Sequence, residues 1–159
     1  MSDLNYFIDT ICSDVSCFDS GHAVFNDYLH DNDDSAVMHY IIDAESEKLI
    51  AYFSLLSSAA LYGEIIRLGA IPAIELKMFA MDKHYQKRGV AHGLLESVLK
   101  VIEQYSAERV GAKIILLYSV PIDAVTSLYK KCGFQLCDGL LVTYKSPFNE
   151  GCIPMYKVL

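Results

Sequence analysis

Apolar residues recur along the chain with two different spacings, and these predict alternating strands and helices. Helical spacing predicts a helix near 21–31, in which Phe25 and Leu29 lie one turn apart, and a long helix over 89–106. A shorter helix is expected after Pro121, and it ends at Gly133 because glycine commonly follows a helix C-terminus.

The remaining apolar segments predict strands. The polar stretch 43–47 is expected to form a hairpin turn, whereas 58–72 contains Gly63, Gly69 and Pro72 and gives no clear element. Residues 112–119 are almost wholly apolar, which is typical of a strand buried on both faces. The pattern predicts a mixed sheet with helices packed on it, with strands near 5–11, 36–43, 48–57, 74–81, 112–119, 134–145 and 152–158.

Length and composition favour a single well-packed domain over 1–159. The chain has 159 residues, of which 53% are hydrophobic and 21% charged, so it can fill one α/β core. No apolar run reaches the roughly 18 residues that span a bilayer. The first residues lack a basic region followed by a long apolar stretch, so we expect no signal peptide, no membrane partner and a cytoplasmic location.

Five cysteines could suggest disulfides or a metal site. An odd number without a secretory signal argues against a disulfide framework. Cys132 and Cys137 lack zinc-knuckle spacing, and no histidine cluster accompanies them. We therefore expect buried thiols and no metal.

Twenty acidic residues against thirteen basic ones give a formal net charge of −7. Such a balance disfavours broad binding of nucleic acids, because phosphates are usually met by clustered lysine and arginine. The densest cationic cluster is formed by Lys83, His84, Lys87 and Arg88.

That cluster precedes a turn that could bind phosphate. A strand ends, a short loop follows, and Gly89 and Ala91 open the long helix. Helix starts carry unpaired N–H groups and a positive dipole end, and small residues let an anion approach the backbone. An ordinary tight helix start is the alternative. The spacing matches neither a P-loop nor the G-x-G-x-x-G of dinucleotide folds.

The turn resembles the signature [Q/R]-x-x-G-x-[G/A] of the GNAT superfamily of N-acetyltransferases, with Gln86, Gly89 and Ala91 at its fixed positions. A second segment, 128–134, is similar to the late family motif L-Y-x-x-x-G-F. The order of elements agrees over 36–145. The resemblance implies an α/β (α+β) fold, with a mixed, mostly antiparallel sheet of about six or seven strands flanked by helices.

The resemblance also implies acetyl-CoA as co-substrate. The backbone of the strand before the turn would pair with the pantetheine arm, and the thioester would lie between Met81 and Ser119. The turn would hold the pyrophosphate. The residues expected to bind the cofactor are Phe79, Ala80, Met81, Gln86, Lys87, Arg88, Gly89, Val90, Ala91 and Ser119.

Acyl transfer to an amine needs a neutral amine, donors for the oxyanion and a proton for the departing thiolate. Tyr129 matches the family tyrosine that resembles a general acid aimed at the sulfur, and we favour this role or positioning of the thiol over the alternative, in which the ring only packs. The N–H of Met81 is the expected oxyanion donor. Glu75 is the candidate base, with an ion pair to Lys77 as the alternative. Five histidines are further candidate bases: His22, His30, His39, His84 and His92.

The acceptor is less well defined. Segment 18–29 resembles the opening of toxin-type GNAT enzymes that acetylate aminoacyl-tRNA, but Asp19 or Ser20 could simply cap a helix. Residues 14–47 carry nine carboxylates, which favours a cationic small amine or peptide over tRNA. A non-catalytic CoA-binding module, an antitoxin partner and a homodimer remain open alternatives.

Overall fold

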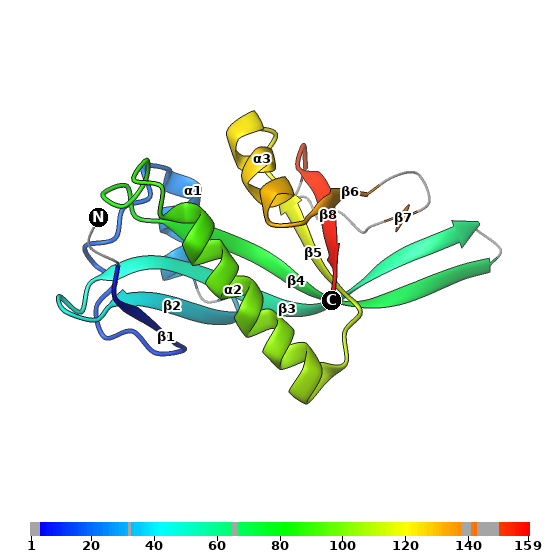
Figure 1. Cartoon of the computed structure of the whole chain (residues 1–159), viewed down its shortest axis with the longest axis horizontal. Helices are drawn as coiled ribbons and strands as arrows, with labels where there is room; N and C mark the ends of the chain where they lie inside the picture. The colour runs from blue at the N-terminus through cyan, green and yellow to red at the C-terminus, as the bar shows by residue number, and fades with distance from the viewer. Residues whose placement is uncertain (1–3, 32, 65–66, 138–140, 143–149) are drawn as a thin grey trace. The chain divides into compact units, whose positions relative to one another are not determined.

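The computed structural model describes residues 4–31, 33–64, 67–137, 141–142 and 150–159. Figure 1 shows how strands and helices alternate along the chain. The elements are β1 (Tyr6–Asp9), α1 (Ala23–His30), β2 (Val37–Asp43), β3 (Leu49–Glu64), β4 (Arg67–Met81), α2 (Ala91–Tyr105), the π-helical turn η1 (Ser106–Val110), β5 (Ile114–Ser119), α3 (Asp123–Lys131), β6 (Gln135–Leu136), β7 (Leu141–Val142) and β8 (Ile153–Val158).

Hydrogen bonds order the strands as β1-β2-β3-β4-β5-β8-β6, and the short β7 pairs with β3. Among the strand pairs described, β4–β5 is parallel and the others are antiparallel. The prediction of a mixed, mostly antiparallel sheet of about seven strands is therefore confirmed.

The residues group into two compact units. The first comprises Met1–Leu56 and Lys77–Ala91, and the second comprises Ser57–Leu76 and His92–Leu159. Charge is divided unequally between them, because the first unit contains 12 acidic and five basic residues, whereas the second contains eight of each. The first unit thus carries the whole net charge of −7. That residues 1–159 form one domain stays a prediction.

The first unit has a core of aromatic and aliphatic side chains beneath α1. Tyr28 and Leu29 of α1 are buried in it, and Phe25 packs against its edge, so the predicted inward face of this helix is confirmed. The rings of Phe18 and Tyr52 meet edge to face at 5.4 Å. The hairpin turn predicted at 43–47 is also present, since the Asp43 N–H donates to Lys48 O at 2.9 Å.

The second unit is built around β5, whose residues Ile115 and Leu116 are fully buried. This agrees with the prediction of a strand covered on both faces. Helix α2 buries one face, made of Leu94, Leu95, Val98, Leu99 and Ile102, at the predicted helical spacing. Helix α3 ends as expected, with Gly133 in the left-handed region at φ +93°.

The structure differs from the sequence analysis in two segments. The unclear segment 58–72 lies in the long strands β3 and β4, apart from 65–66, which fall outside the described residues. Gly69 serves close packing there, since a Cβ at this position would overlap the Tyr62 ring. The strand predicted over 134–145 is two separate two-residue strands, β6 and β7; residues 138–140 and 143–145 lie outside the described residues.

None of the five cysteines forms a disulfide. Cys132 is buried, but Cys17 is exposed and the other three are half-buried, so the expectation of buried thiols holds for Cys132 only. In the described part of the chain, no helix is both long and apolar enough to cross a membrane.

Candidate functional site

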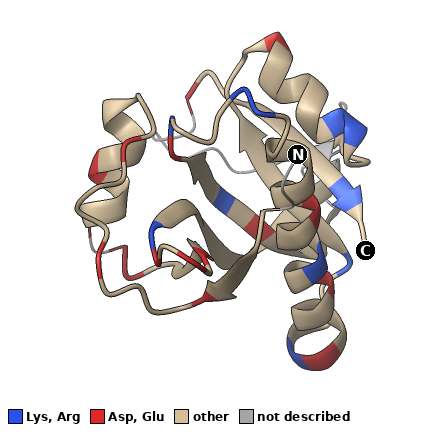
Figure 2. Ribbon diagram, turned by 60° about the vertical axis from the view of Figure 1, so that its left-hand side comes forward, with Lys and Arg blue, Asp and Glu red and all other residues tan. Residues whose placement is uncertain are grey.

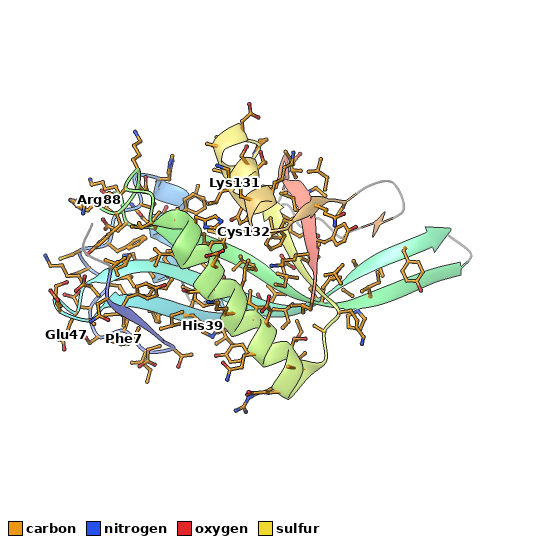
Figure 3. All side chains as sticks on the ribbon, in the orientation of Figure 1. Phe7, His39, Glu47, Arg88, Lys131 and Cys132 are labelled. Atoms are coloured by element: carbon orange, nitrogen blue, oxygen red, sulfur yellow. The ribbon has the colours of Figure 1, made fainter. Side chains whose placement is uncertain are left out.

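The predicted phosphate-binding turn lies in the first unit, on the loop that ends at α2 and includes Arg88 (Figure 3). Helix α2 begins at Ala91, two residues later than the sequence predicted, so Gly89 belongs to the turn itself. Lys87 and Gly89 both adopt left-handed backbone conformations, with φ of +59° and +73°. Such residues within a turn direct successive N–H groups towards one side, as in anion-binding nests.

The N–H groups of this turn are available for a ligand. Residues 87–89 are exposed, and Val90 is half-buried. Among the acceptors of the described residues, none receives a hydrogen bond from the N–H groups of 87–90. Because unsatisfied backbone donors seek an acceptor, this arrangement suits an anion such as a pyrophosphate.

The side chain of Gln86 lies within the protein rather than along the exposed surface of the turn. Its amide nitrogen donates to Ser20 O at 2.8 Å and to Met81 O at 2.7 Å. The side chain therefore joins the end of β4 to the segment before α1. That Gln86 contributes to cofactor binding stays a prediction. Both hydrogens of its side-chain amide already donate to backbone carbonyl groups of the protein.

Asp82 is a residue that the sequence analysis missed. Only 4% of it is exposed, and its carboxylate accepts hydrogen bonds from the Asp19 N–H at 2.9 Å, the His84 N–H at 2.8 Å and His84 Nδ1 at 2.7 Å. Asp19 in turn forms an ion pair with Lys83 at 2.6 Å. The segment before α1 and the phosphate-binding turn are thus fastened together.

The helix caps differ from those predicted. His22, rather than Asp19 or Ser20, occupies the N-cap position of α1, and no side chain caps the helix. Ser20 and Asp19 instead bind Asn26, which accepts from the Ser20 N–H and donates to Asp19 Oδ1 at 2.8 and 2.9 Å. Asp19, Ser20 and Asn26 therefore stabilise the loop before α1 rather than cap the helix.

A cavity of about 590 Å³ lies beside the turn within the first unit. This is within the usual size range of small-molecule sites. Tyr85 and Arg88 of the turn line it, with the Arg88 guanidinium 5.8 Å from the Tyr85 ring centroid. Lys48 adds a second cation, and Asp14 and Glu47 contribute carboxylates.

Tyr129 lies in the second unit, on α3, and is 8% exposed. Its ring meets Phe134 edge to face, at 5.7 Å between centroids. Burial raises the pKa of the Tyr129 phenol well above its usual value, and negative charge on Cys132 would raise it further. The phenol therefore keeps its proton at neutral pH, which suits a proton donor and not a base.

Glu75 and Ser119 also lie in the second unit. Ser119 ends β5 and is 2% exposed, with its hydroxyl donating to Val120 O at 3.0 Å. Glu75 is buried on β4, opposite Leu116 of β5. The described β4–β5 ladder ends at Leu76 and Leu117, whereas β4 continues to Met81. The partner that the sequence suggested for Glu75, Lys77, binds Asp33 instead, at 2.6 Å.

The acidic segment 14–47 is partly neutralised. Besides the Asp19–Lys83 pair, the Asp33 carboxylate accepts from Lys77 and from the Tyr28 hydroxyl at 2.7 Å. Burial by itself would raise the pKa of Asp33, but the hydrogen bonds from Lys77, Ser35 and Tyr28 outweigh it and hold this pKa well below its usual value. Figure 2 shows acidic and basic residues on the same ribbon.

The candidate histidine bases are placed differently from one another. His39 is 3% exposed and stacks on Phe53 at 4.7 Å, and burial lowers the pKa of its imidazole. His84 contacts Asp82, and His92 lies 3.8 Å from Glu96 one helical turn away. Within the described residues, no group of three or more His, Cys, Asp or Glu could hold a metal ion.

A second, smaller pocket of about 240 Å³ lies within the second unit. Lys131 and Cys132, at the end of α3, line it together with Lys100 and Lys157 (Figure 3). Glu103 is 3.9 Å from the Lys157 ammonium. Three lysines and two glutamates, with Glu96 the second of these, therefore line one shallow pocket of this unit.

Known structures share this fold over nearly the whole chain. A crystal structure of AtaTR bound with acetyl-CoA has a TM-score of 0.75 at 19% identity, covering 99% of this chain and 95% of that chain. AtaT complexed with acetyl-methionyl-tRNAfMet has a TM-score of 0.71 at 17% identity, with coverages of 97% and 95%. The KacTA–DNA complex has a TM-score of 0.71 at 18% identity, with coverages of 97% and 93%.

No curated protein matches the chain by sequence. The model of the acetyltransferase (GNAT) family, however, matches residues 6–134, which is most of the chain. The phosphate-binding turn and all of α3 fall inside this match. The chain therefore belongs to the GNAT acetyltransferase family and is an enzyme that uses acetyl-CoA as its co-substrate.

Proposed function

We propose that this enzyme acetylates the α-amino group of an aminoacyl-tRNA. The observation that carries the proposal is the likeness, over 97% of the chain, to AtaT complexed with acetyl-methionyl-tRNAfMet. The resemblance of segment 18–29 to the opening of toxin-type enzymes supports it. The resemblance indicates the family branch; the segment itself forms hydrogen bonds with Asp82 and Gln86, and it is assigned no contact with the acceptor.

On the cofactor side, the N–H groups of residues 87–91 bind the pyrophosphate, and Phe79, Ala80 and Met81 pair with the pantetheine arm. The exposed N–H groups and left-handed residues of the turn support this assignment. The N–H of Met81 stabilises the oxyanion, and Ser119 is assigned to the cofactor on the family resemblance alone. These roles follow the family motif, residue by residue.

In the chemical step, the amine attacks the acetyl carbonyl, the new C–N bond forms and the C–S bond breaks. The amine loses one proton and the CoA thiolate gains one. We assign the proton donor to Tyr129, whose raised pKa keeps it protonated. Glu75 receives the amine proton, directly or through water.

The chemistry of the acceptor also favours an α-amine. The reference pKa of an α-amino group is about 8, whereas that of a lysine amine is about 10.4. An α-amine is therefore partly neutral at pH 7 without help from a strong base. A single buried carboxylate such as Glu75 is then a sufficient base.

Charge does not oppose a tRNA acceptor as strongly as the sequence analysis suggested. The excess of carboxylates is confined to the first unit, and the second unit is neutral. Its pocket is lined by three lysines and two glutamates, Lys100, Lys131, Lys157, Glu96 and Glu103, so it keeps one excess positive charge. Lysines of this kind bind backbone phosphates. A small cationic amine or peptide is the second candidate, because the first unit keeps a net charge of −7.

An acetylation assay on charged tRNA, polyamines and lysine peptides at two ionic strengths tests the proposal. We expect acetylation of aminoacyl-tRNA, falling steeply as salt rises, because released counterions drive phosphate binding. The double variant Lys100→Gln/Lys131→Gln should flatten the salt dependence by about 1.5 in slope and leave small-amine turnover unchanged.

Lys113→Gln is the matched control, since Lys113 is an exposed lysine of the same unit that does not line the pocket. Turnover of polyamines with no acetylation of charged tRNA would replace the proposal by the second candidate. Binding of CoA without turnover of any acceptor would indicate a non-catalytic module.

A further inference from the structure

We infer that Asp19, which precedes α1, and Asn26, in its first turn, are positioning residues for acetyl-CoA, and that segment 18–29 serves the cofactor rather than the acceptor. The inference rests on the proposed assignment of the turn 86–91 to the pyrophosphate. Neither residue touches that turn's exposed N–H groups. Both act through the hydrogen bonds that hold the turn in place.

Three backbone positions link the two segments directly. The Lys83 N–H donates to Asp19 O at 2.8 Å, and the Asp19 N–H donates to the buried Asp82 carboxylate at 2.9 Å. The Gln86 amide donates to Ser20 O at 2.8 Å. Residues 82–86, which lead into the turn, are therefore attached to residues 19–20 at both ends of that stretch.

The Asp19 carboxylate forms hydrogen bonds on both sides of this contact between residues 19–20 and 82–86. One oxygen, Oδ1, accepts from the Gly21 N–H at 2.8 Å and from Asn26 Nδ2 at 2.9 Å. The other, Oδ2, binds the Lys83 ammonium at 2.6 Å. These hydrogen bonds, those from Lys83 and Asn26 above all, hold the pKa of Asp19 well below its usual value. The carboxylate thus stays charged at any working pH.

The Asn26 side chain, on α1, binds both Asp19 and Ser20. Its carbonyl oxygen accepts from the Ser20 N–H and hydroxyl, both at 2.8 Å, while its amide holds Asp19. Gly21 permits the bend between them, with φ at +83°. The polar residues Asp19, Ser20 and Asn26 of segment 18–29 accordingly form hydrogen bonds within the first unit. Its apolar residues Phe18, Tyr28 and Leu29 are buried in the core of that unit.

A carboxylate next to a phosphate-binding turn should repel the anionic ligand. Whether Asp19→Asn raises or lowers the affinity for CoA therefore distinguishes simple electrostatics from positioning. Asp19→Asn removes a negative charge near an anionic cofactor, so electrostatics by itself predicts tighter binding of CoA. Positioning predicts the opposite, because the neutral side chain binds Lys83 weakly and releases the turn. We expect binding of CoA to weaken about fivefold to tenfold.

The experiment measures CoA affinity of the full chain by calorimetry, and KM and kcat for acetyl-CoA, well below the unfolding temperature. For Asp19→Asn we expect a raised dissociation constant and KM with kcat nearly unchanged. Asp27→Asn is the matched control, because Asp27 is an exposed carboxylate on α1, in the same segment, and undergoes the same charge change. Its affinity should stay the same or rise slightly.

Asn26→Leu removes the amide without changing charge, and should weaken CoA binding in the same direction even if Asp19→Asn folds poorly. Unchanged or tighter binding in the folded variants, together with weak binding by Gly89→Val, would overturn the inference and leave the turn assigned to the cofactor. Wild-type affinity in Gly89→Val would instead remove the site assignment, and the inference with it.

Discussion

Replacing Tyr129 with phenylalanine should lower kcat about 100-fold and leave the dissociation constant of acetyl-CoA nearly unchanged. The substitution keeps the ring, and therefore its contact with Phe134, but removes the proton that we propose Tyr129 donates to the departing thiolate. Loss of a general acid typically costs a factor of this size. Steady-state kinetics with the best acceptor and calorimetry with CoA measure the two quantities separately.

The pH profile gives a second test of the same residue. The pKa of Tyr129 is raised, so the phenol loses its proton only at a pH above its usual value of about 10. Between pH 7 and about 10 we therefore expect no fall in kcat from its ionisation. A variant with wild-type kcat would reduce Tyr129 to a residue of the α3 packing, and unchanged unfolding temperatures would exclude a folding defect as the cause of a low kcat.

Replacing Gly89 with valine should weaken binding of acetyl-CoA at least tenfold, or about 1.4 kcal/mol. Two effects add. A branched side chain would lie where a phosphate oxygen approaches the backbone. In addition, Gly89 has φ +73°, a conformation that β-branched residues rarely adopt. The turn would relax to another backbone conformation and redirect its N–H groups.

The space around Gly89 is open, so the effect of Gly89→Val on packing should be small. A Cβ at Gly89 meets no heavy atom within 4 Å, so the substitution should cause no steric clash in the core, and the backbone strain should stay within the exposed turn. Gly93→Ala is a suitable control, since its Cβ also meets nothing within 4 Å and its φ is not positive. Unchanged CoA affinity in folded Gly89→Val protein would show that the pyrophosphate binds elsewhere.

The elements that sequence reasoning predicted well are those whose evidence is local. The turn at Gln86, Gly89 and Ala91 is recognisable because its spacing is fixed within six residues, and α3 ends at a glycine that needs positive φ. The periodic burial of α2 follows directly from the spacing of its apolar residues.

The parts that failed depend on contacts between distant residues. Gly69 looked like a breaker, but its lack of a side chain accommodates the Tyr62 ring in a continuous strand pair. Asp82 directly follows the apolar strand that ends at Met81, where a carboxylate looks like an ordinary loop residue, yet it accepts the Asp19 N–H from 63 residues away. Likewise, Lys77 seemed a partner for Glu75 because it is near in sequence, whereas the fold brings it to Asp33.

The exposed thiol of Cys17 is a natural site for attaching a fluorescent label near the phosphate-binding turn. Cys17 lines the same cavity as Tyr85 and Arg88, and it is the exposed one among the five cysteines. An alkylating fluorophore should react there first, because thiol reactivity follows access. The dye would then sit beside the turn, where its emission could follow the arrival and departure of CoA in real time, without a radiolabel or a coupled assay.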